Sequence, residues 1–291
     1  MSSGSRVGLV GLGAMGWPMA ANLVSAGVDV TVYDLDTSRL DRFAAEHPCV
    51  VARHPADLAA VSILITMLPD GHVVADVVRN WEGGLLSVLE PGSTIVDMSS
   101  SSPSGTIELL EEARRHGLDL VDAPVSGGVP RATDATLSIM VGAADESFAK
   151  VEATLRKLGR AIFRTGPVGS GHAMKALNNV LAAAAYAALA EAIEVGRAYS
   201  LDPKTLVDVV NESTGRSFTS EVVFGQNVIP ATYATGFALG LLAKDAGIAA
   251  EMASTVDVEA PVLQLVAERW SEALAGVGFT ADHSRAHTAW W

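Results

Sequence analysis

The chain has 291 residues, of which 49% are hydrophobic and 18% charged, and its net charge is −13 at pH 7. This length can hold about two domains of ordinary size, and the apolar content argues against a disordered chain. The negative charge argues against a general nucleic-acid-binding surface, which needs clustered cations. A local site for an anionic substrate remains compatible with it.

Cys49 is the single cysteine, so neither an intrachain disulfide nor a cysteine-based metal cluster is expected. His283 and His287 have a spacing that would suit a metal, but we interpret them as part of a frayed tail and expect no metal. Residues 1–6 lack the apolar core of a signal peptide. The longest helical apolar run, Val180 to Ala190, is too short to cross a bilayer. We therefore expect a soluble, cytoplasmic protein with no membrane partner.

The chain begins with a predicted strand, loop and helix. Val7-Gly-Leu-Val10 indicates a buried strand, Gly11-Leu-Gly13-Ala-Met-Gly16 a loop, and Trp17 to Ala26 a helix. A GxGxxG sequence alone is a weak signal, but between a strand and a helix it is typical of a dinucleotide site. There the glycines allow a tight turn, approach of the pyrophosphate and close helix packing, and the helix N-terminus faces the phosphates.

A second predicted strand, Val28 to Tyr33, ends at Asp34. A carboxylate about 20 residues after the glycines typically receives the ribose hydroxyls of NAD. Asp36 adds charge that would repel the extra phosphate of NADP, whereas Arg39 could accept that phosphate. The alternative for Asp34 is an N-cap of the next helix, Thr37 to Ala45. We favour the NAD interpretation, with NADP possible.

Strands and helices then alternate as far as Phe163, which predicts an open, mostly parallel sheet. After Gly169 the periodicity is helical only. The predicted fold is an α/β Rossmann domain with a doubly wound, mostly parallel sheet, residues 1–165, followed by an all-α domain, residues 166–291. The further strands are expected at Ser62–Met67, Ser93–Asp97, Leu118–Val121, Thr136–Val141 and Ala161–Phe163. The further helices are expected at Val73–Arg79, Thr106–His116, Glu146–Leu158, His172–Ser200, Pro203–Asn211, Leu239–Ala253 and Pro261–Leu274.

The helix that opens the second domain carries polar groups on an alanine-rich background. Lys175 and Asn179 are four residues apart, so they share one face, with Asn178 beside them. Such groups are costly to bury without partners. They are either solvated in the first turns or face an interdomain cleft, as a proton donor and a hydrogen-bonding partner.

Together, these motifs resemble those of the β-hydroxyacid dehydrogenase family, which includes 3-hydroxyisobutyrate dehydrogenase, tartronate semialdehyde reductase and glyoxylate/succinic semialdehyde reductases. The resemblance spans nearly the whole chain in the family's order. It rests on Gly11–Gly16 with Pro18–Asn22, Met67-Leu-Pro69, Asp97 and the serines before Pro103, Asp122-Ala-Pro-Val-Ser-Gly-Gly128, Gly169-x-Gly-x-x-x-Lys175-x-x-x-Asn179, and Lys244-Asp245.

The resemblance implies an NAD-dependent enzyme that interconverts a short 3-hydroxy acid and its semialdehyde. It implies that Lys175 is catalytic with Asn179 beside it, and that Ser126, Gly127 and Gly128 hold the substrate carboxylate. The implied cofactor residues are Gly11, Leu12, Gly13, Ala14, Met15, Gly16, Asp34, Leu68, Pro69, Ser100 and Lys244. It also implies a homodimer or homotetramer formed through the helical domain.

The chemistry of the residues agrees with these roles. Lys175 as ammonium would donate a proton to a carbonyl oxygen, and as neutral amine would accept one from a hydroxyl. A free lysine has a pKa of about 10.4, so we expect desolvation or a neighbouring cation such as Lys244 to lower the pKa of Lys175.

Some positions depart from the family pattern. Arg131 and Ala135 stand where many members have glycine. Arg131 either reaches an anionic group of a larger substrate or, as we favour, pairs with Asp134. The final Trp290-Trp291 packs on a partner subunit or covers a cleft. His172 either touches cofactor or substrate, or is a helix-terminal histidine.

Two other functions remain as alternatives. An imine reductase-like enzyme on the same fold is disfavoured because Lys175 keeps the hydroxyacid pattern. A catalytically silent dinucleotide sensor is disfavoured because it would need neither Lys175 and Asn179 nor the Ser126–Gly128 segment.

Overall fold

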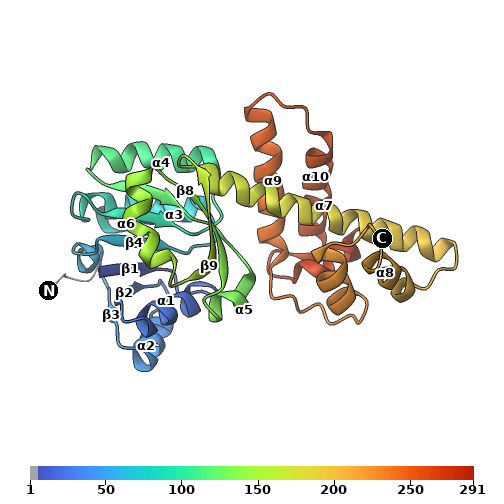
Figure 1. Ribbon diagram of the computed structural model, residues 1–291, viewed down its shortest axis with the longest axis horizontal. Coiled ribbons are helices and arrows are strands. Elements are labelled where there is room, and N and C mark those ends of the chain that lie inside the picture. Colours follow the sequence, from blue (N-terminus) through green and yellow to red (C-terminus); the bar gives the residue numbers. More distant parts are fainter. Residues whose placement is uncertain (1–5) are drawn as a thin grey trace. The chain divides into compact units, whose positions relative to one another are not determined.

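The computed structural model describes residues 6–291. Its first part is built on a nine-stranded sheet in the order β3-β2-β1-β4-β5-β6-β8-β7, with β9 paired to β8. Figure 1 shows this sheet with helices around it. The strands from β3 to β6 pair in parallel, and the order reverses direction between β1 and β4, which is the hallmark of a doubly wound sheet. The strands are β1 (Arg6–Val10), β2 (Asp29–Tyr33), β3 (Val50–Val51), β4 (Ile63–Thr66), β5 (Thr94–Asp97), β6 (Asp119–Asp122), β7 (Val125–Ser126), β8 (Leu137–Gly142) and β9 (Gly159–Gly166).

Helices cover both faces of this sheet because successive strand residues point to opposite sides. In β4, Ile63 and Ile65 join a core with three of the helices, α1 (Gly16–Ser25), α2 (Thr37–Glu46) and α6 (Asp145–Leu155). Leu64 joins a second core with α3 (Gly71–Asn80) and α4 (Pro103–Arg115). Three short 3₁₀ segments, Pro55–Leu58, Trp81–Gly83 and Leu85–Ser87, lie between these elements.

The sheet departs from the predicted pattern beyond β6. There β8 runs antiparallel to β6 and β7 but parallel to β9. The sequence analysis missed β3, β7 and the helix α5 (Gly128–Thr133). Two-residue strands and a six-residue helix are too short to carry a recognisable period.

The second part is helical. It contains most of α7 (Ser170–Ala198), followed by α8 (Pro203–Asn211), a π-helical segment (Thr219–Val228), α9 (Leu239–Thr255), α10 (Pro261–Val277) and a 3₁₀ segment (His283–Ala289). Its core surrounds Trp270, Tyr186 and Phe224, which are almost fully buried. The Rossmann-type sheet and the helical second part confirm the predicted fold class.

The two compact units are residues up to Lys175 and Ala176–Trp291. The sequence analysis placed this boundary earlier, after residue 165. The first turns of α7 belong to the sheet-containing unit, so Lys175 is the last residue of that unit.

The expectation that the apolar run in α7 is too short for a bilayer was wrong as to length. By length and composition the 29-residue α7 is long and apolar enough to span a membrane, with a mean hydropathy of 1.4 over 18 residues. Half of that window is buried in the protein, and Ala176, Val180, Ala183 and Tyr186 contribute to the helical core. The described helix is thus packed as a core helix.

Candidate functional site

The glycine loop after β1 has the geometry of a dinucleotide cradle. Gly11 has a φ of +100°, which glycine adopts readily, and a methyl group at Gly16 would overlap the Gly11 carbonyl oxygen. A Cβ at Gly13 would meet no atom within 4 Å. The first and third glycines are therefore required by the turn and the packing, whereas the second leaves open space for a ligand against the backbone. These residues fit the phosphates of a dinucleotide.

Asp34 at the end of β2 faces this loop. Its carboxylate accepts the Leu12 N–H at 2.6 Å and the Asp36 N–H at 2.9 Å, and pairs with the Arg39 guanidinium at 3.0 Å. The N-cap of α2 is Asp36, which accepts from the backbone N–H groups of Ser38 and Arg39. The alternative role of Asp34 as that N-cap is excluded, and its carboxylate stands beside the glycine loop as a ribose-binding acid would.

The segment after β4 lies next to the glycine loop that follows β1, the neighbouring strand of the sheet. A Cβ on Gly11 would contact the Leu68 side chain at 3.0 Å, and the Leu68 N–H donates to Ser99 Oγ at 3.0 Å. Pro69 is exposed next to it, and Ser100 is half-buried. The serine that holds Leu68 is thus Ser99, the neighbour of the predicted Ser100.

Asp97 holds the serine run after β5 in place. Its carboxylate accepts from Thr66 Oγ1 at 2.9 Å, the Ser99 N–H at 3.0 Å and Ser101 Oγ at 2.7 Å. Asp97 thus fixes the loop that follows β5. The loops after β1, β2, β4 and β5 all lie at carboxyl ends of parallel strands, where open α/β sheets bind ligands.

The predicted substrate segment, Ser126–Gly128, joins β7 to α5. Gly127 and Gly128 are exposed, with φ values of +131° and +64°. Arg131, one turn further, lies over Gly127 and forms no ion pair with Asp134 among the described residues. The predicted surface pair of Arg131 and Asp134 was wrong, because the arginine side chain bends back along the loop.

A buried polar cluster anchors the start of α7. Asp122, at the end of β6, accepts the N–H groups of Gly169 and His172, each at 2.8 Å. His172 is 1% exposed; its Nδ1 lies 2.8 Å from Thr106 Oγ1, and its Nε2 lies 3.6 Å from Asp97. Burial raises the pKa of Asp122 above its usual value, although the nearby His172 and the two N–H donors oppose that rise. His172 is therefore a structural anchor one turn before Lys175, and it is not exposed for contact with a ligand.

In the helical unit, a buried acid joins two of the predicted residues. Asn179 donates from Nδ2 to Asp245 Oδ2 at 2.6 Å, and Lys244 Nζ lies 3.1 Å from Asp245 Oδ1. Asn178 donates to Asn179 Oδ1 at 3.1 Å, so the amide of Asn179 is fixed at both ends. The sequence analysis assigned no role to Asp245. Its only signal was its place in the Lys244-Asp245 pair.

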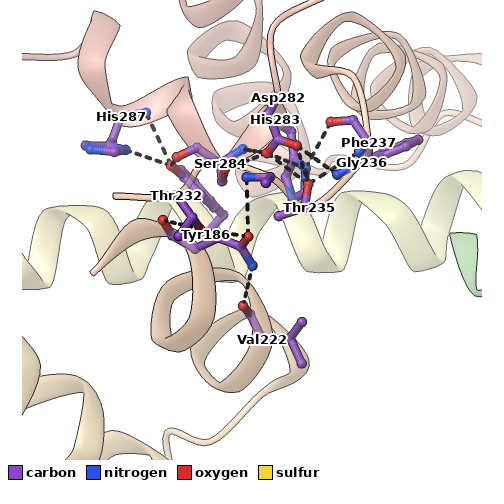
Figure 2. A network of polar contacts seen from close by, with 12 residues as sticks. Tyr186, Val222, Thr232, Thr235, Gly236, Phe237, Asp282, His283, Ser284 and His287 are labelled. Carbon is purple, nitrogen blue, oxygen red and sulfur yellow. Dashed lines mark hydrogen bonds and ion pairs between the residues drawn. The ribbon is translucent and has the colours of Figure 1, made fainter. Parts of the chain in front are cut away.

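The C-terminal tail is part of the helical core, which corrects its interpretation as frayed. Figure 2 shows the polar network around it: Asp282 accepts from Thr235 Oγ1 and the Gly236 N–H, each at 2.9 Å, and Tyr186 Oη donates to Ser284 O at 2.7 Å. His287 Nδ1 lies 2.8 Å from the same tyrosine oxygen. Within residues 6–291, no group of three histidine, cysteine or acidic side chains could hold a metal ion.

The two final tryptophans differ in role. Trp290 donates from its indole to Arg269 O at 3.0 Å and stacks edge-on against Trp270. Trp291 is 59% exposed and lines a small pocket of the helical unit together with Tyr233 and His287. Of the two predicted roles, covering a cleft suits Trp291.

Comparison with known proteins agrees with this geometry. Residues 6–166 match the family described as NAD binding domain of 6-phosphogluconate dehydrogenase, and residues 169–290 match NAD-binding of NADP-dependent 3-hydroxyisobutyrate dehydrogenase. The chain is 38% identical to 2-(hydroxymethyl)glutarate dehydrogenase of Eubacterium barkeri, over 92% of this chain and 89% of that one. It is 36% identical to mitochondrial 3-hydroxyisobutyrate dehydrogenase of Rattus norvegicus, over 90% and 79% of the two chains. Among solved structures, it is similar to Mycobacterium tuberculosis 3-hydroxyisobutyrate dehydrogenase with L-serine, with a TM-score of 0.89, 29% identity and coverage of 99% of both chains.

Proposed function

Because the chain belongs to the 3-hydroxyisobutyrate dehydrogenase family of NAD(P)-dependent oxidoreductases, we propose that it interconverts a short 3-hydroxy acid and its semialdehyde. Family membership confirms the resemblance read from the motifs. The observation that carries the proposal is the set of groups in one compact unit: an open glycine loop faced by Asp34, the Ser126–Gly128 segment with its two exposed glycines, and Lys175 on an anchored helix.

Each group has a proposed task. NAD, when bound, supplies the hydride acceptor, and the protein places the substrate carbon and manages one proton. The N–H groups of Gly127 and Gly128 and the hydroxyl of Ser126 hold the substrate carboxylate. Lys175 accepts the hydroxyl proton during oxidation and returns it to the carbonyl oxygen during reduction. Asp245 orients the amide of Asn179 within the helical unit. The proposed role of Asn179 is to hydrogen-bond the substrate, and that of Lys244 is to contact the cofactor.

The proposed preference is for NAD. Arg39, the one cation of this segment that could receive the phosphate of NADP, is paired with Asp34 at 3.0 Å and Asp36 at 3.6 Å. Binding of that phosphate would require breaking these pairs beside two carboxylates, which is unfavourable.

The two alternatives lose support for separate reasons. An imine reductase-like activity does not need the hydroxyacid pattern that Lys175 keeps. A silent sensor would not need the anchored start of α7 or the buried Asn179–Asp245 pair.

The assembly and location are further parts of the proposal. Leu181, Val195 and Tyr199 are exposed by 59–79% of their area along α7, which suits a homodimer or homotetramer formed through helices. We place the enzyme in the cytoplasm.

The test is turnover with NAD and NADP on a panel of 3-hydroxy acids, their semialdehydes and cyclic imines. The proposal expects oxidation of at least one hydroxy acid, with a higher kcat/KM for NAD than for NADP. Tight cofactor binding with no turnover of any hydroxy acid or semialdehyde would contradict the proposed function. Reduction of imines alone would replace it by the imine reductase function.

A further inference from the structure

Arg131 covers the segment that is proposed to hold the substrate carboxylate. A Cβ built on Gly127 would stand 2.8 Å from Arg131 Cβ and 3.0 Å from Arg131 Cγ, and would overlap Cδ. The aliphatic stem of this arginine therefore lies directly over the Gly127 backbone. The stem brings its guanidinium into the neighbourhood of the same loop, since only one bond separates Cδ from the first guanidinium nitrogen.

The charge of Arg131 is not satisfied within the protein. Arg39, Arg79 and Arg156 each pair with an acid at 3.0 Å or less, whereas the side chain of Arg131 forms no hydrogen bond or ion pair among residues 6–291. The side chain is exposed, and Asp134, three residues later, does not reach it. In a chain with a net charge of −13, this cation is available to a ligand.

Resting on the proposed function, we propose that Arg131 binds a second carboxylate of the substrate, so that the enzyme acts on a 3-hydroxy acid with an additional carboxylate. A guanidinium matches a carboxylate with two parallel N–H donors, which makes it the preferred partner for such a group. The substrate's first carboxylate occupies the Ser126–Gly128 segment. Oxidation converts the CH₂OH group to an aldehyde, with the hydride passing to NAD and the proton to Lys175, and leaves both carboxylates unchanged.

The comparisons provide independent support. The relative that is 38% identical is named for 2-(hydroxymethyl)glutarate, a dicarboxylate with a hydroxymethyl group. The relatives named for 3-hydroxyisobutyrate act, by name, on a monocarboxylate.

A matched substrate pair tests this role. 2-(Hydroxymethyl)glutarate and 2-(hydroxymethyl)pentanoate have the same reacting end, but the second carries a methyl group in place of the distal carboxylate. The wild-type enzyme is expected to favour the diacid, and the ratio of kcat/KM for diacid over monoacid should fall about 10- to 100-fold in Arg131→Ala, mainly through KM. Arg131→Lys keeps the positive charge but loses the two parallel N–H donors of the guanidinium, so it should retain part of the preference for the diacid.

Arg160→Ala is the matched control, because Arg160 in β9 is also exposed and without a partner among the described residues. Its ratio should equal that of the wild type. An unchanged ratio in Arg131→Ala, or a wild type without preference for the diacid, overturns the role of Arg131 and leaves the proposed function standing. Failure of the wild type to oxidise either acid or any other hydroxy acid overturns the proposed function itself.

Discussion

Single side chains fix the loops at the edge of the sheet where we propose that the cofactor binds. Asp34 is the clearest case, since one carboxylate restrains the glycine loop through Leu12, its own turn through Asp36, and the cation of Arg39. Its position and its residue type were predictable from the spacing to the glycines. Its pairing with Arg39 was not, because that depends on the rotamer of a long side chain.

Replacing the charge of Asp34 tests its role. The Leu12 and Asp36 N–H groups bind different oxygens of Asp34, so Asp34→Asn keeps an acceptor for only one of them. It also loses the charge-assisted bond that we propose to a ribose hydroxyl. We expect the KM for NAD to rise about 10-fold or more and the preference over NADP to shrink. Steady-state kinetics with both cofactors measure this, with Asp41→Asn, which removes a surface charge paired with Arg53, as control. An unchanged ratio of NAD to NADP efficiency would count against the assignment.

Ala135 stores backbone strain beside the substrate segment. Its φ of +53° is a left-handed conformation that suits glycine, the residue many family members have there. Ala135→Gly should therefore raise the free energy of unfolding by about 0.5–1 kcal/mol. Urea unfolding measures the change, and Ala26→Gly, at a φ of −82°, should show no gain. A loss of stability in Ala135→Gly would contradict this account.

At the scale of elements, the predictable parts were those with a clear period. The long helices and the apolar strands could be recognised from spacing and flanking glycines. The π-helical segment Thr219–Val228 could not, since its sequence has neither the helical nor the strand period. The bond from Asn179 to Asp245 depends on how α9 packs on α7, which no local pattern encodes.

The start of α7 offers an element-scale prediction. Thr106→Val keeps the shape of the side chain but removes the partner of His172 Nδ1 and the bond to Ser102 O. A buried group left unpaired costs about 1–3 kcal/mol, so the free energy of unfolding should fall by that amount. Because the anchor precedes Lys175 by one turn, kcat should fall as well, whereas KM for NAD should change little.

Thr133→Val is the control for this change. It removes a similar hydroxyl-to-carbonyl bond, to Val129 O, at an exposed position of α5. Equal effects of the two substitutions on kcat would argue that the contact between Thr106 and His172 does not position α7.

At the scale of the molecule, the sequence predicted two domains and their classes but not the role of the tail. The tail packs through Trp290 and through hydrogen bonds to Tyr186; His283 there is buried and His287 is half-buried, so neither lies in a frayed segment. Burial lowers the pKa of His283 and of His287. Burial alone would raise the pKa of Asp282, but hydrogen bonds led by those from Ser284 outweigh it and hold that pKa below its usual value.

These shifts predict acid lability of the helical unit. Between the lowered folded-state pKa of a histidine and its unfolded value near 6.5, the unfolded chain binds more protons, so stability falls as pH falls through this range. The slope is at most about 1.4 kcal/mol per pH unit for each histidine. Asp282 acts in a lower window, because its contribution is lost only as pH falls below the ordinary carboxyl pKa.

Urea unfolding at pH 5, 6, 7 and 8 measures this dependence. His287→Gln should flatten the slope relative to the wild type, because it removes one of the two histidines whose pKa is lowered in the folded protein. The same slope in both proteins would show that His287 does not contribute to the pH dependence of the free energy of unfolding.

The central claim is that Lys175 transfers the proton, and Lys175→Ala tests it most directly. The measurement pairs kcat on the best hydroxy acid with the Kd for NADH from fluorescence, using Lys150→Ala on the exposed face of α6 as control. The account predicts a loss of kcat of about 10²- to 10⁴-fold in Lys175→Ala with an unchanged Kd. Near-normal turnover in that variant would contradict it and assign the proton to another residue.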